Sequence, residues 1–402
     1  MTVQLAPSER RRIIVLGYLV RGPVGGGAWQ NLQYVLGFAR LGHDVWYLED
    51  SDDEHAPCYD PSVDAWTADP TYGLDFTHRA FTRLGLGDRW AYFDSVPQHW
   101  RGPAAADIHH VCESADVVLN ISGVNPLRPW LVDVPARALV GTDPAFDQIR
   151  NLTIPDRRER SALHTSFFTY GTAIGSPQYD VPDDGFRWQP TRQPVVLDAW
   201  PVVDPPTRSM FTTVMQWGSY ASLEYEGHHY GMKDESFDAV LDLPSRAGAV
   251  FDLAIGSPHV PRVLLREHGW RLQDPIAVSR DPWTYQRFIQ RSRAEFSVAK
   301  HGYVVSGSGW FSERSAAYLA SGRPVVVEDT GFTSWLPVGE GIVPFRSVEE
   351  AAQGVQSVLR SNARHRVAAR EIAAEYFDAR RVLSDVLEAC DAETRRPTRK
   401  PV

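Results

Sequence analysis

One stretch near the C-terminal end constrains the fold of this chain more than any other: SGSGWFSERSAAYLASGRPVVVEDTGF, residues 306–332. The apolar run 303–305 before it predicts a buried strand that ends in the turn 306–309. Ser312 can cap a short helix, which ends at the Gly-Arg-Pro that follows. The β-branched run 325–327 predicts a second strand, followed by an acidic loop that contains glycine. The stretch therefore predicts a strand–helix–strand unit.

The two turns of this unit each follow a strand, and the two strands are expected to be parallel neighbours. Open α/β sheets bind ligands at the edge where the carboxyl ends of such strands lie. The small residues of 306–309 allow a sharp turn, and they predict backbone N–H groups that are open to an anion. The start of the next helix is a natural phosphate site. The unit is therefore expected to bind a ligand that contains phosphate.

The segment from Glu313 to Gly331 reads E-x6-ASGRPVV-x3-TG. It resembles the donor-binding segment of bacterial-type, nucleotide-sugar-dependent glycosyltransferases of the GT-B fold. The resemblance implies an α/β protein of two Rossmann-like, doubly wound parallel-sheet domains that face a cleft. Two features depart from the common retaining pattern of that family. A second glutamate at E-x7-E spacing is absent before Gly322, and Asp-Thr-Gly-Phe replaces the usual double glycine after the next strand.

The same resemblance assigns roles in this stretch. It implies that Glu313 holds the ribose of the donor, that backbone amides at the helix start hold the diphosphate, and that the loop after the second strand meets the sugar. The donor contacts implied here are Ser306, Gly307, Ser312, Glu313, Arg314, Ser315, Thr330, Gly331 and Phe332.

The N-terminal half shows the same alternation of elements. The sequence predicts a buried strand over 12–17, a glycine-rich turn over 22–27, an amphipathic helix over 29–41 and a second strand over 45–49. In GT-B enzymes the first glycine-rich loop faces the donor across the cleft. The resemblance therefore implies donor contacts for Gly25, Gly26 and Gly27.

Two residues of this half are candidates for the base that an inverting sugar transfer needs. Asp143 follows a predicted strand and is expected on the same rim as the glycine-rich turn. His164 opens the strand-like run 164–170 and could move a proton. A turn or capping role for Asp143 and a structural role for His164 stay open as alternatives.

The proline-rich segment 189–206 predicts a linker, after which the strand pattern restarts over 210–218. Trp217, in that strand, is assigned to the donor site. Lys233 opens the next helix, and the resemblance implies that it binds the diphosphate; a surface lysine at a helix start is the alternative.

These boundaries give three predicted regions. Residues 1–200 are expected to form an acceptor-binding domain, and residues 201–380 a nucleotide-sugar-binding domain. Residues 381–402 are expected to form a helix that returns toward the first domain, with a disordered tail from Thr394.

Composition restricts the partners. A net charge of −9 over 402 residues argues against a nucleic-acid backbone as the main partner. Only three lysines occur, at 233, 300 and 400, so an interior lysine is notable. The three cysteines are far apart and predict no disulfide framework, which favours the reducing cytoplasm. No signal peptide is recognised, and no apolar run approaches the ~20 residues of a membrane span.

The acidic run 50–53, Asp-Ser-Asp-Asp, follows a predicted strand. Asp-x-Asp at such a place binds a divalent ion in glycosyltransferases of another common fold, and hard carboxylates would suit that ion. A solvated acidic loop is the simpler explanation, so we predict no metal and no cofactor. The leaving diphosphate would then be stabilised by the helix start with Lys233 or Arg314.

The sequence thus predicts a metal-independent hexosyltransferase, with a nucleotide-diphosphate sugar as co-substrate and a hydroxyl of a small molecule or glycan as acceptor. The aromatic residues of 54–110 suit a flat or apolar acceptor and equally suit a core. Two alternatives stay open. A sugar-nucleotide epimerase of the same fold would turn over its substrate without an acceptor, and an inert GT-B-like binding protein would bind the nucleotide sugar and release nothing.

Overall fold

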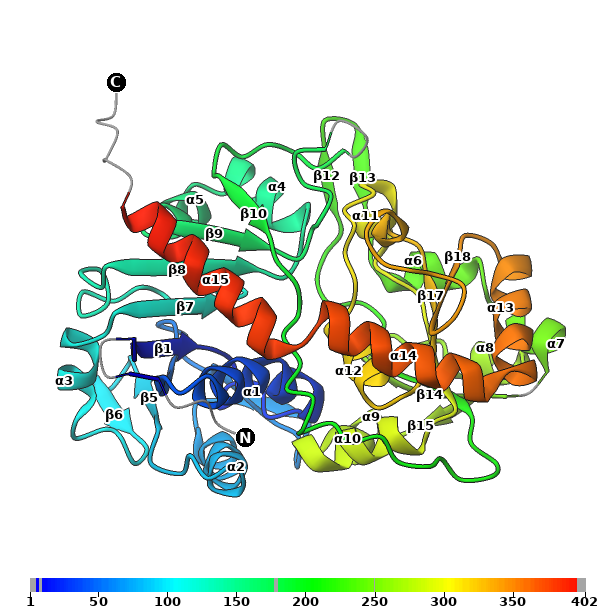
Figure 1. The fold of residues 1–402 in the computed structure, drawn as a ribbon, viewed down its shortest axis with the longest axis horizontal. Coiled ribbons are helices and arrows are strands. Elements are labelled where there is room, and N and C mark those ends of the chain that lie inside the picture. The colour runs from blue at the N-terminus through cyan, green and yellow to red at the C-terminus, as the bar shows by residue number, and fades with distance from the viewer. Residues whose placement is uncertain (1–4, 7–8, 177–179, 249, 396–402) are drawn as a thin grey trace.

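The structure is a computed structural model that describes residues 5–6, 9–176, 180–248 and 250–395 (Figure 1). Its framework is two sheets, one of eight strands from the first half of the chain and one of six strands from the second half. The sheets divide within the proline-rich segment, because β10 ends at Pro190 and β11 begins at Phe211. The predicted alternation of strands and helices in an α/β fold is confirmed.

Neighbouring strands of the first sheet run parallel, except for the antiparallel pair β5 and β6 at one edge. Ile14 of β1 lies opposite Trp46 of β2 and Val118 of β7, so the order of the chain reverses beside β1. Across the sheet the strands are β10 (Trp188–Pro190), β9 (Ser166–Thr169), β8 (Ala136–Gly141), β7 (Val117–Ile121), β1 (Arg12–Leu16), β2 (Asp44–Asp50), β5 (Trp90–Asp94) and β6 (His99–Arg101).

The second sheet is parallel throughout, and its order reverses beside β11. Phe211 of β11 lies opposite Phe251 of β14 and Ala294 of β16. Across the sheet the strands are β15 (Arg271–Gln273), β14 (Phe251–Gly256), β11 (Phe211–Gln216), β16 (Ala294–Ser297), β17 (Val325–Glu328) and β18 (Ile342–Phe345).

Helices cover both sheets, and two antiparallel hairpins extend from the connections. In the first half the helices are α1 (Gly25–Arg40), α2 (Thr71–Arg83), α3 (Ile108–Glu113), α4 (Phe146–Thr153) and α5 (Pro155–Ala162). In the second half they are α6 (Lys233–Asp238), α7 (Leu243–Ala247), α8 (Arg262–Glu267), α9 (Pro275–Ser279), α10 (Pro282–Arg291), α11 (His301–Val305), α12 (Glu313–Ala320), the 3₁₀ turn η1 (Phe332–Ser334), α13 (Val348–Arg360), α14 (Asn362–Tyr376) and α15 (Ala379–Thr394). The hairpins pair β3 (Cys58–Asp60) with β4 (Ala65–Thr67) and β12 (Leu223–Tyr225) with β13 (His228–Tyr230).

Close helix packing joins the two halves. One apolar core includes the inner faces of α1, α12 and α15 together with strands of the first sheet. A Cβ atom at Gly37 of α1 would lie 2.4 Å from Cδ1 of Leu383 of α15, so only glycine lets the two helices approach so closely. In Figure 1, α15 crosses over the first sheet, while α14 covers the second.

The chain crosses between the halves twice, and the two crossings are hydrogen-bonded to each other. The N–H of Val195 donates to the carbonyl of Phe377 at 2.7 Å, and the N–H of Ala379 donates back to the carbonyl of Val195 at 2.9 Å. After this crossing α15 packs on α1 and on strands β8 and β9 of the first sheet. Helix α15 includes Thr394, where a disordered tail was predicted; residues 396–402 lie outside the described residues.

Two predicted elements are wrong. The apolar run before the turn 306–309 is not a strand, because His301–Val305 forms α11. The glycine-rich turn ends earlier than predicted, since Gly25–Arg40 forms α1 and its first three residues are glycines. No helix in the described part of the chain is long and apolar enough to cross a membrane.

Candidate active site

A cleft of about 1190 Å³ lies between the two halves. Its lining includes residues that follow β1, β7 and β8 of the first sheet and β11, β14 and β16 of the second. These carboxyl ends flank the points where each strand order reverses, where open α/β sheets bind ligands. The predicted site residues that line the cleft are Gly26, Gly27, Asp143, Lys233, Ser312, Glu313 and Arg314.

Asp143 lies in an ion-pair cluster that joins both halves. Its carboxylate lies 2.8 Å from Nζ of Lys300, which precedes α11, and 3.2 Å from Nη1 of Arg150 on α4. The hydroxyls of Tyr220 and Tyr303 donate hydrogen bonds to the same carboxylate. All five residues line the cleft. The cluster therefore fixes a charged wall to which each half contributes.

The charges of this cluster limit what Asp143 can do. Burial alone would raise the pKa of Asp143, but Lys300 and Arg150 outweigh that effect and lower its pKa below the usual value. A carboxylate stabilised in this way is a weak base. Asp143 is therefore better suited to accept a hydrogen bond from a ligand hydroxyl than to take a proton.

Asp147, one turn later on α4, has the opposite environment. It also lines the cleft, and one carboxylate oxygen accepts the N–H of Asp143 at 3.1 Å. Burial and the negative charge of Asp143 raise the pKa of Asp147 to about 7, although Arg150 and Arg157 act in the other direction. A carboxyl group with this pKa can take up or release a proton near neutral pH.

Replacing Asp147 with asparagine should stabilise the protein at alkaline pH. The folded state binds a proton at Asp147 up to about pH 7, whereas the usual aspartate pKa is 3.8. The folded state therefore loses stability as the pH rises through this window, and the loss can reach about 4 kcal/mol at pH 8. The free energy of unfolding, measured with urea, should fall less between pH 5 and pH 8 for Asp147→Asn than for the native chain. Equal drops would contradict the raised pKa.

Lys233 is the first residue of α6 and is half-buried in the cleft wall. Burial, reinforced by the charge of Arg314, lowers the pKa of Lys233 to about 7. No carboxylate in the described part of the chain forms an ion pair with its ammonium group. The cleft therefore holds a desolvated cation that an anionic ligand would stabilise.

The start of α12 lies beside Lys233 in the same lining. Ser312 is the N-cap, and its hydroxyl accepts the N–H of Arg314 at 3.2 Å. Glu313 is the first residue of the helix and lines the cleft. The first N–H groups of an α-helix have no partner within the helix and carry its positive dipole end. The predicted helix start is confirmed, and it can supply amide donors to an anion.

Arg314 has a different role from Lys233. Its Nε lies 2.5 Å from Oε1 of Glu295, and Nη1 and Nη2 donate to the carbonyl of Val214 at 2.8 Å and the hydroxyl of Ser297 at 2.6 Å. These bonds tie α12 to strands β11 and β16. Because three of its nitrogens donate within the protein, Arg314 is a weaker candidate for the diphosphate than Lys233.

The turn 306–309 does not leave its amides open, as the sequence predicted. The N–H groups of Gly307, Ser308 and Gly309 donate to the carbonyls of Val304 at 3.1 Å, Tyr303 at 3.3 Å and Thr330 at 2.7 Å. A Cβ atom at Gly309 would lie 2.4 Å from the hydroxyl of Thr172. The turn packs closely against the first half and has no free donors at these positions.

The glycines of α1 also serve packing. A Cβ atom at Gly25 would lie 2.6 Å from the carbonyl oxygen of Asp281 and 2.7 Å from Cβ of Tyr285, at the start of α10. Gly26 and Gly27 line the cleft, and a Cβ atom at Gly27 would meet only Val24, at 3.7 Å. Gly25 therefore lets the two halves approach, and Gly27 is the one of the three with room for a ligand.

The remaining predicted donor contacts do not line the cleft among the described residues. Trp217 packs on Phe237, with ring centroids 5.1 Å apart, and Phe332 packs on Phe311 at 5.3 Å. The hydroxyl of Thr330 donates to the carbonyl of Trp310. Ser306, Gly307, Ser315 and Gly331 also lie outside the cleft lining, and the donor roles of all these residues stay predictions.

His164 lies outside the cleft, which weighs against its predicted role as a base. Its Nδ1 donates to the carbonyl of Ser161 at 3.1 Å, and its Nε2 lies 3.2 Å from Nδ2 of Asn120. Burial lowers the pKa of His164 to about 4. It lines a smaller cavity of about 40 Å³ whose walls share Ser122, Asp147, Arg150 and Arg157 with the cleft, so its role as a base stays a prediction.

The acidic run 50–53 is occupied by arginines. Asp50 and Asp53 accept hydrogen bonds from Arg128, both at 2.8 Å, and Asp52 lies 2.9 Å from Arg160. These ion pairs account for the carboxylates without a divalent ion.

Sequence reasoning missed several residues of the charged wall: Asp147, Arg150, Tyr220, Lys300 and Tyr303. Asp143 and Lys300 are 157 residues apart, so no local motif joins them. The rarity of lysine in this chain is the one sequence signal that points to Lys300.

Comparison with known proteins adds a likeness in structure. No protein-family model matches the chain, and no curated protein matches it in sequence. An alpha-glucosyltransferase in complex with UDP and a 13-mer DNA has a TM-score of 0.58 at 10% identity, covering 95% of this chain and 100% of that one. Anabaena HepE in complex with UDP and glucose has a TM-score of 0.54 at 11% identity, covering 95% of this chain and 100% of that one.

Sucrose-phosphate synthase from Thermosynechococcus elongatus gives 0.54 at 13% identity, covering 95% of this chain and 100% of that one. These identities are too low to carry an activity from one protein to another, but the likenesses extend over nearly the whole chain. Together with the two parallel sheets and the cleft at their carboxyl ends, they establish the architecture. The chain therefore has the GT-B fold, in which two Rossmann-like domains face one cleft.

Proposed function

We propose that this protein is a glycosyltransferase that moves a hexose from a nucleotide-diphosphate sugar to a hydroxyl of an acceptor, without a metal ion in the transfer step. The observation that carries the proposal is Lys233. Its ammonium group has no ion pair among the described residues, and it shares the cleft lining with the first residue of α12. A half-buried cation beside a helix start suits a diphosphate.

The chemistry of transfer explains why this arrangement is useful. When the bond between the sugar and the diphosphate breaks, negative charge develops on the leaving diphosphate. Donors that are already in place stabilise that charge at little reorganisation cost. Lys233 and the first amides of α12 are such donors, and Glu313 can accept hydrogen bonds from ribose hydroxyls. Glu313 therefore keeps the ribose-binding role that the sequence resemblance implies.

The opposite wall would position the reacting groups. The cluster of Asp143, Lys300 and two tyrosines offers both acceptors and donors for sugar hydroxyls. If the transfer inverts the sugar, Asp147 is a better base than Asp143, since its pKa of about 7 matches the task. His164 does not line the cleft itself, so we prefer Asp147 to it.

We propose a UDP-sugar as the donor, with UDP-glucose as the first to test, because the similar structures were solved with UDP or UDP-glucose. The acceptor side would include the β3–β4 hairpin, whose Tyr59, Asp64 and Trp66 line the cleft. The side chain of Trp66 is 58% exposed, and such a ring can stack on a flat aglycone or a sugar. A net charge of −9 disfavours DNA as the acceptor.

A cytoplasmic location agrees with this substrate class and with the cysteines. Cys58, Cys112 and Cys390 are all free thiols, and all are buried. Their state suits a reducing compartment.

The test is calorimetry with UDP, dTDP and GDP, with and without EDTA. We expect saturable binding of UDP that EDTA leaves unchanged. Glu313→Ala should weaken binding by about tenfold or more, the equivalent of about 1.4 kcal/mol. The matched control is Glu349→Ala, since Glu349 is a carboxylate 58% exposed in a surface ion pair with Arg246. Failure of all three nucleotides to bind would overturn the proposal.

The same protein can be tested for the two alternative functions. Incubation with UDP-glucose alone should release UDP slowly by transfer to water, and faster when an acceptor is present. An epimerase would change the sugar and keep it on the nucleotide. An inert binding protein would bind UDP-glucose and release no UDP.

A further inference from the structure

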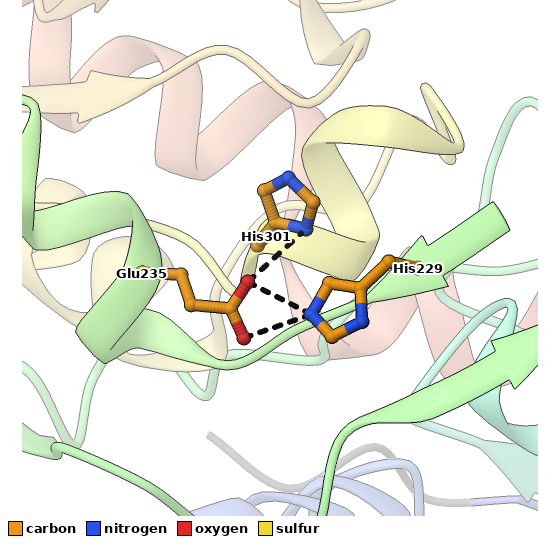
Figure 2. A group of neighbouring side chains, drawn as sticks. All are labelled: His229, Glu235 and His301. Carbon is orange, nitrogen blue, oxygen red and sulfur yellow. Dashed lines mark hydrogen bonds and ion pairs between the residues drawn. The ribbon is translucent and has the colours of Figure 1, made fainter.

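Three side chains from three separate elements converge on the surface of the second half (Figure 2). They are His229 on β13, Glu235 on α6 and His301, the first residue of α11. One nitrogen or oxygen of each lies within 4.8 Å of the others. Residues 229 and 301 are far apart in the chain, so the fold itself builds this group.

The contacts within the group turn its nitrogens and oxygens toward one point. Nε2 of His229 lies 2.9 Å and 3.0 Å from the two oxygens of Glu235, and Nδ1 of His301 lies 3.8 Å from one of them. Figure 2 shows both imidazole rings directed at the carboxylate. The side chains are 41%, 37% and 33% exposed for His229, Glu235 and His301, so an ion has access from solvent.

A second carboxylate holds the His229 ring in place. Nδ1 of His229 interacts with Oε1 of Glu224, on the neighbouring strand β12. A proton on Nδ1, donated to this carboxylate, leaves the lone pair of Nε2 directed at the other two residues. Histidines that bind metals have such a partner on their second nitrogen almost without exception, because it fixes the tautomer and orients the ring.

The backbone of Gly231 lies close to the group. A Cβ atom at position 231 would lie 2.1 Å from Oε1 of Glu235, so a side chain there would displace the carboxylate from its present position. The N–H of Gly231 makes a long hydrogen bond, 3.3 Å, to Nδ1 of His301. A bound ion would take the place of this bond at His301.

We propose that His229, Glu235 and His301 bind a divalent transition-metal ion such as Zn²⁺, with Glu224 orienting His229 and water completing the coordination. Two imidazoles with one carboxylate are a donor set for such ions, whereas Mg²⁺ and Ca²⁺ prefer oxygen ligands alone. Zn²⁺ binds these atoms at about 2.0–2.2 Å, which places tetrahedral ligands about 3.4 Å apart. Modest side-chain rotation from the present distances achieves that spacing.

The site would be structural and distinct from the cleft. None of its three ligands lines the cleft, but their elements also carry cleft residues: Lys233 opens α6 and Lys300 caps α11. A bound ion would join the β12–β13 hairpin to both helix starts. Its function would be to fix the β12–β13 hairpin on the two helices, and its existence does not depend on the proposed transferase activity.

The test is calorimetry of the full chain, freed of metal by a chelator, with ZnCl₂, and absorption spectroscopy with CoCl₂. We expect one ion per chain with micromolar or tighter affinity, a Co²⁺ spectrum of four- or five-coordinate geometry, and a rise in Tm on binding. His301→Ala and Glu235→Gln should each weaken Zn²⁺ binding by about 100-fold, and Glu224→Gln by about 10-fold or more. MgCl₂ should give no binding heat at this site.

The matched control is His228→Ala. His228 neighbours His229 on β13, is 61% exposed and points to the other face of the hairpin. It should leave Zn²⁺ affinity and the Co²⁺ spectrum unchanged. The proposal is overturned if the native chain binds no Zn²⁺, or binds it equally well when both His229 and His301 are alanine. Circular dichroism of the Glu235→Gln variant, which keeps the side-chain shape, separates lost ligation from lost folding.

Discussion

Replacing Lys233 with glutamine is expected to lower kcat/KM for a UDP-sugar by about 10²–10³-fold, because the leaving diphosphate loses its half-buried cation. The same change should not lower Tm. Lys233 has no ion pair among the described residues, and burial lowers its pKa to about 7, so its charge costs stability in the ligand-free protein. Loss of activity together with unchanged or raised stability separates a ligand-binding role from a structural one.

Two control variants accompany this prediction. One keeps a positive charge at position 233, and the other removes a positive charge at the surface. Lys233→Arg keeps a cation and should retain more activity than Lys233→Gln. Arg246→Gln removes a surface cation that pairs with Glu349, and it should leave kcat/KM within twofold. The measurement is release of UDP from UDP-glucose at several substrate concentrations. An unchanged kcat/KM in Lys233→Gln would show that the diphosphate lies elsewhere.

Replacing Glu49 with alanine is expected to lower the free energy of unfolding by about 3–5 kcal/mol. Glu49 is the penultimate residue of β2, and its side chain is fully buried. Its carboxylate accepts the N–H groups of Leu19, Val20 and Arg21 at 2.6, 2.8 and 2.7 Å, and the hydroxyl of Tyr47 at 2.6 Å. Without it, the N–H groups of Val20 and Arg21 and the hydroxyl of Tyr47 lose this acceptor, and the segment between β1 and α1 loses its support.

Urea unfolding at neutral pH measures this effect. Glu49→Gln should cost less than Glu49→Ala, since one amide oxygen still accepts hydrogen bonds while the NH₂ group faces donors. The control is Glu54→Ala, which removes an exposed carboxylate five residues later and should change the free energy of unfolding by less than about 0.5 kcal/mol. Because the supported segment includes Tyr18, Gly22 and Val24 of the cleft lining, Glu49→Ala should also weaken nucleotide binding.

The alternation of strands and helices could be predicted from the sequence, because it depends on residues that are close together in the chain. The run Val325–Glu328 is a buried parallel strand, and Ser312 caps α12, as predicted. These elements depend on β-branched residues, caps and glycine or proline boundaries, which are all properties of neighbouring residues.

Two local predictions failed where packing between distant segments decides the structure. Gly25 begins a helix because its missing side chain lets α10 approach, and this contact compensates for the poor helix propensity of glycine. The apolar run before Ser306 forms α11, with Gly302 packed closely against Phe146 of the first half. Propensity gave the wrong element because the deciding contacts come from the other half of the chain.

Neither the charged wall nor the histidine–glutamate group could be predicted from the sequence, and the reason is related. Asp143 meets Lys300, and His229 meets His301, only after both sheets have formed and docked. The sequence placed Asp143 at a strand end facing the cleft, but not the partners that lower its pKa. The base assignment changed with those partners, since they leave Asp147 as the carboxyl with a pKa near 7.

The paired crossings between the halves have a mechanical consequence. A two-domain protein joined by one linker can twist as well as open, whereas two adjacent crossings, held together by the bonds of Val195 with Phe377 and Ala379, resist twisting. Relative motion of the two halves is therefore restricted to rotation about one axis. Cleavage of the chain in the first crossing, between β10 and β11, should leave the two halves associated, because α15 still packs on α1, β8 and β9.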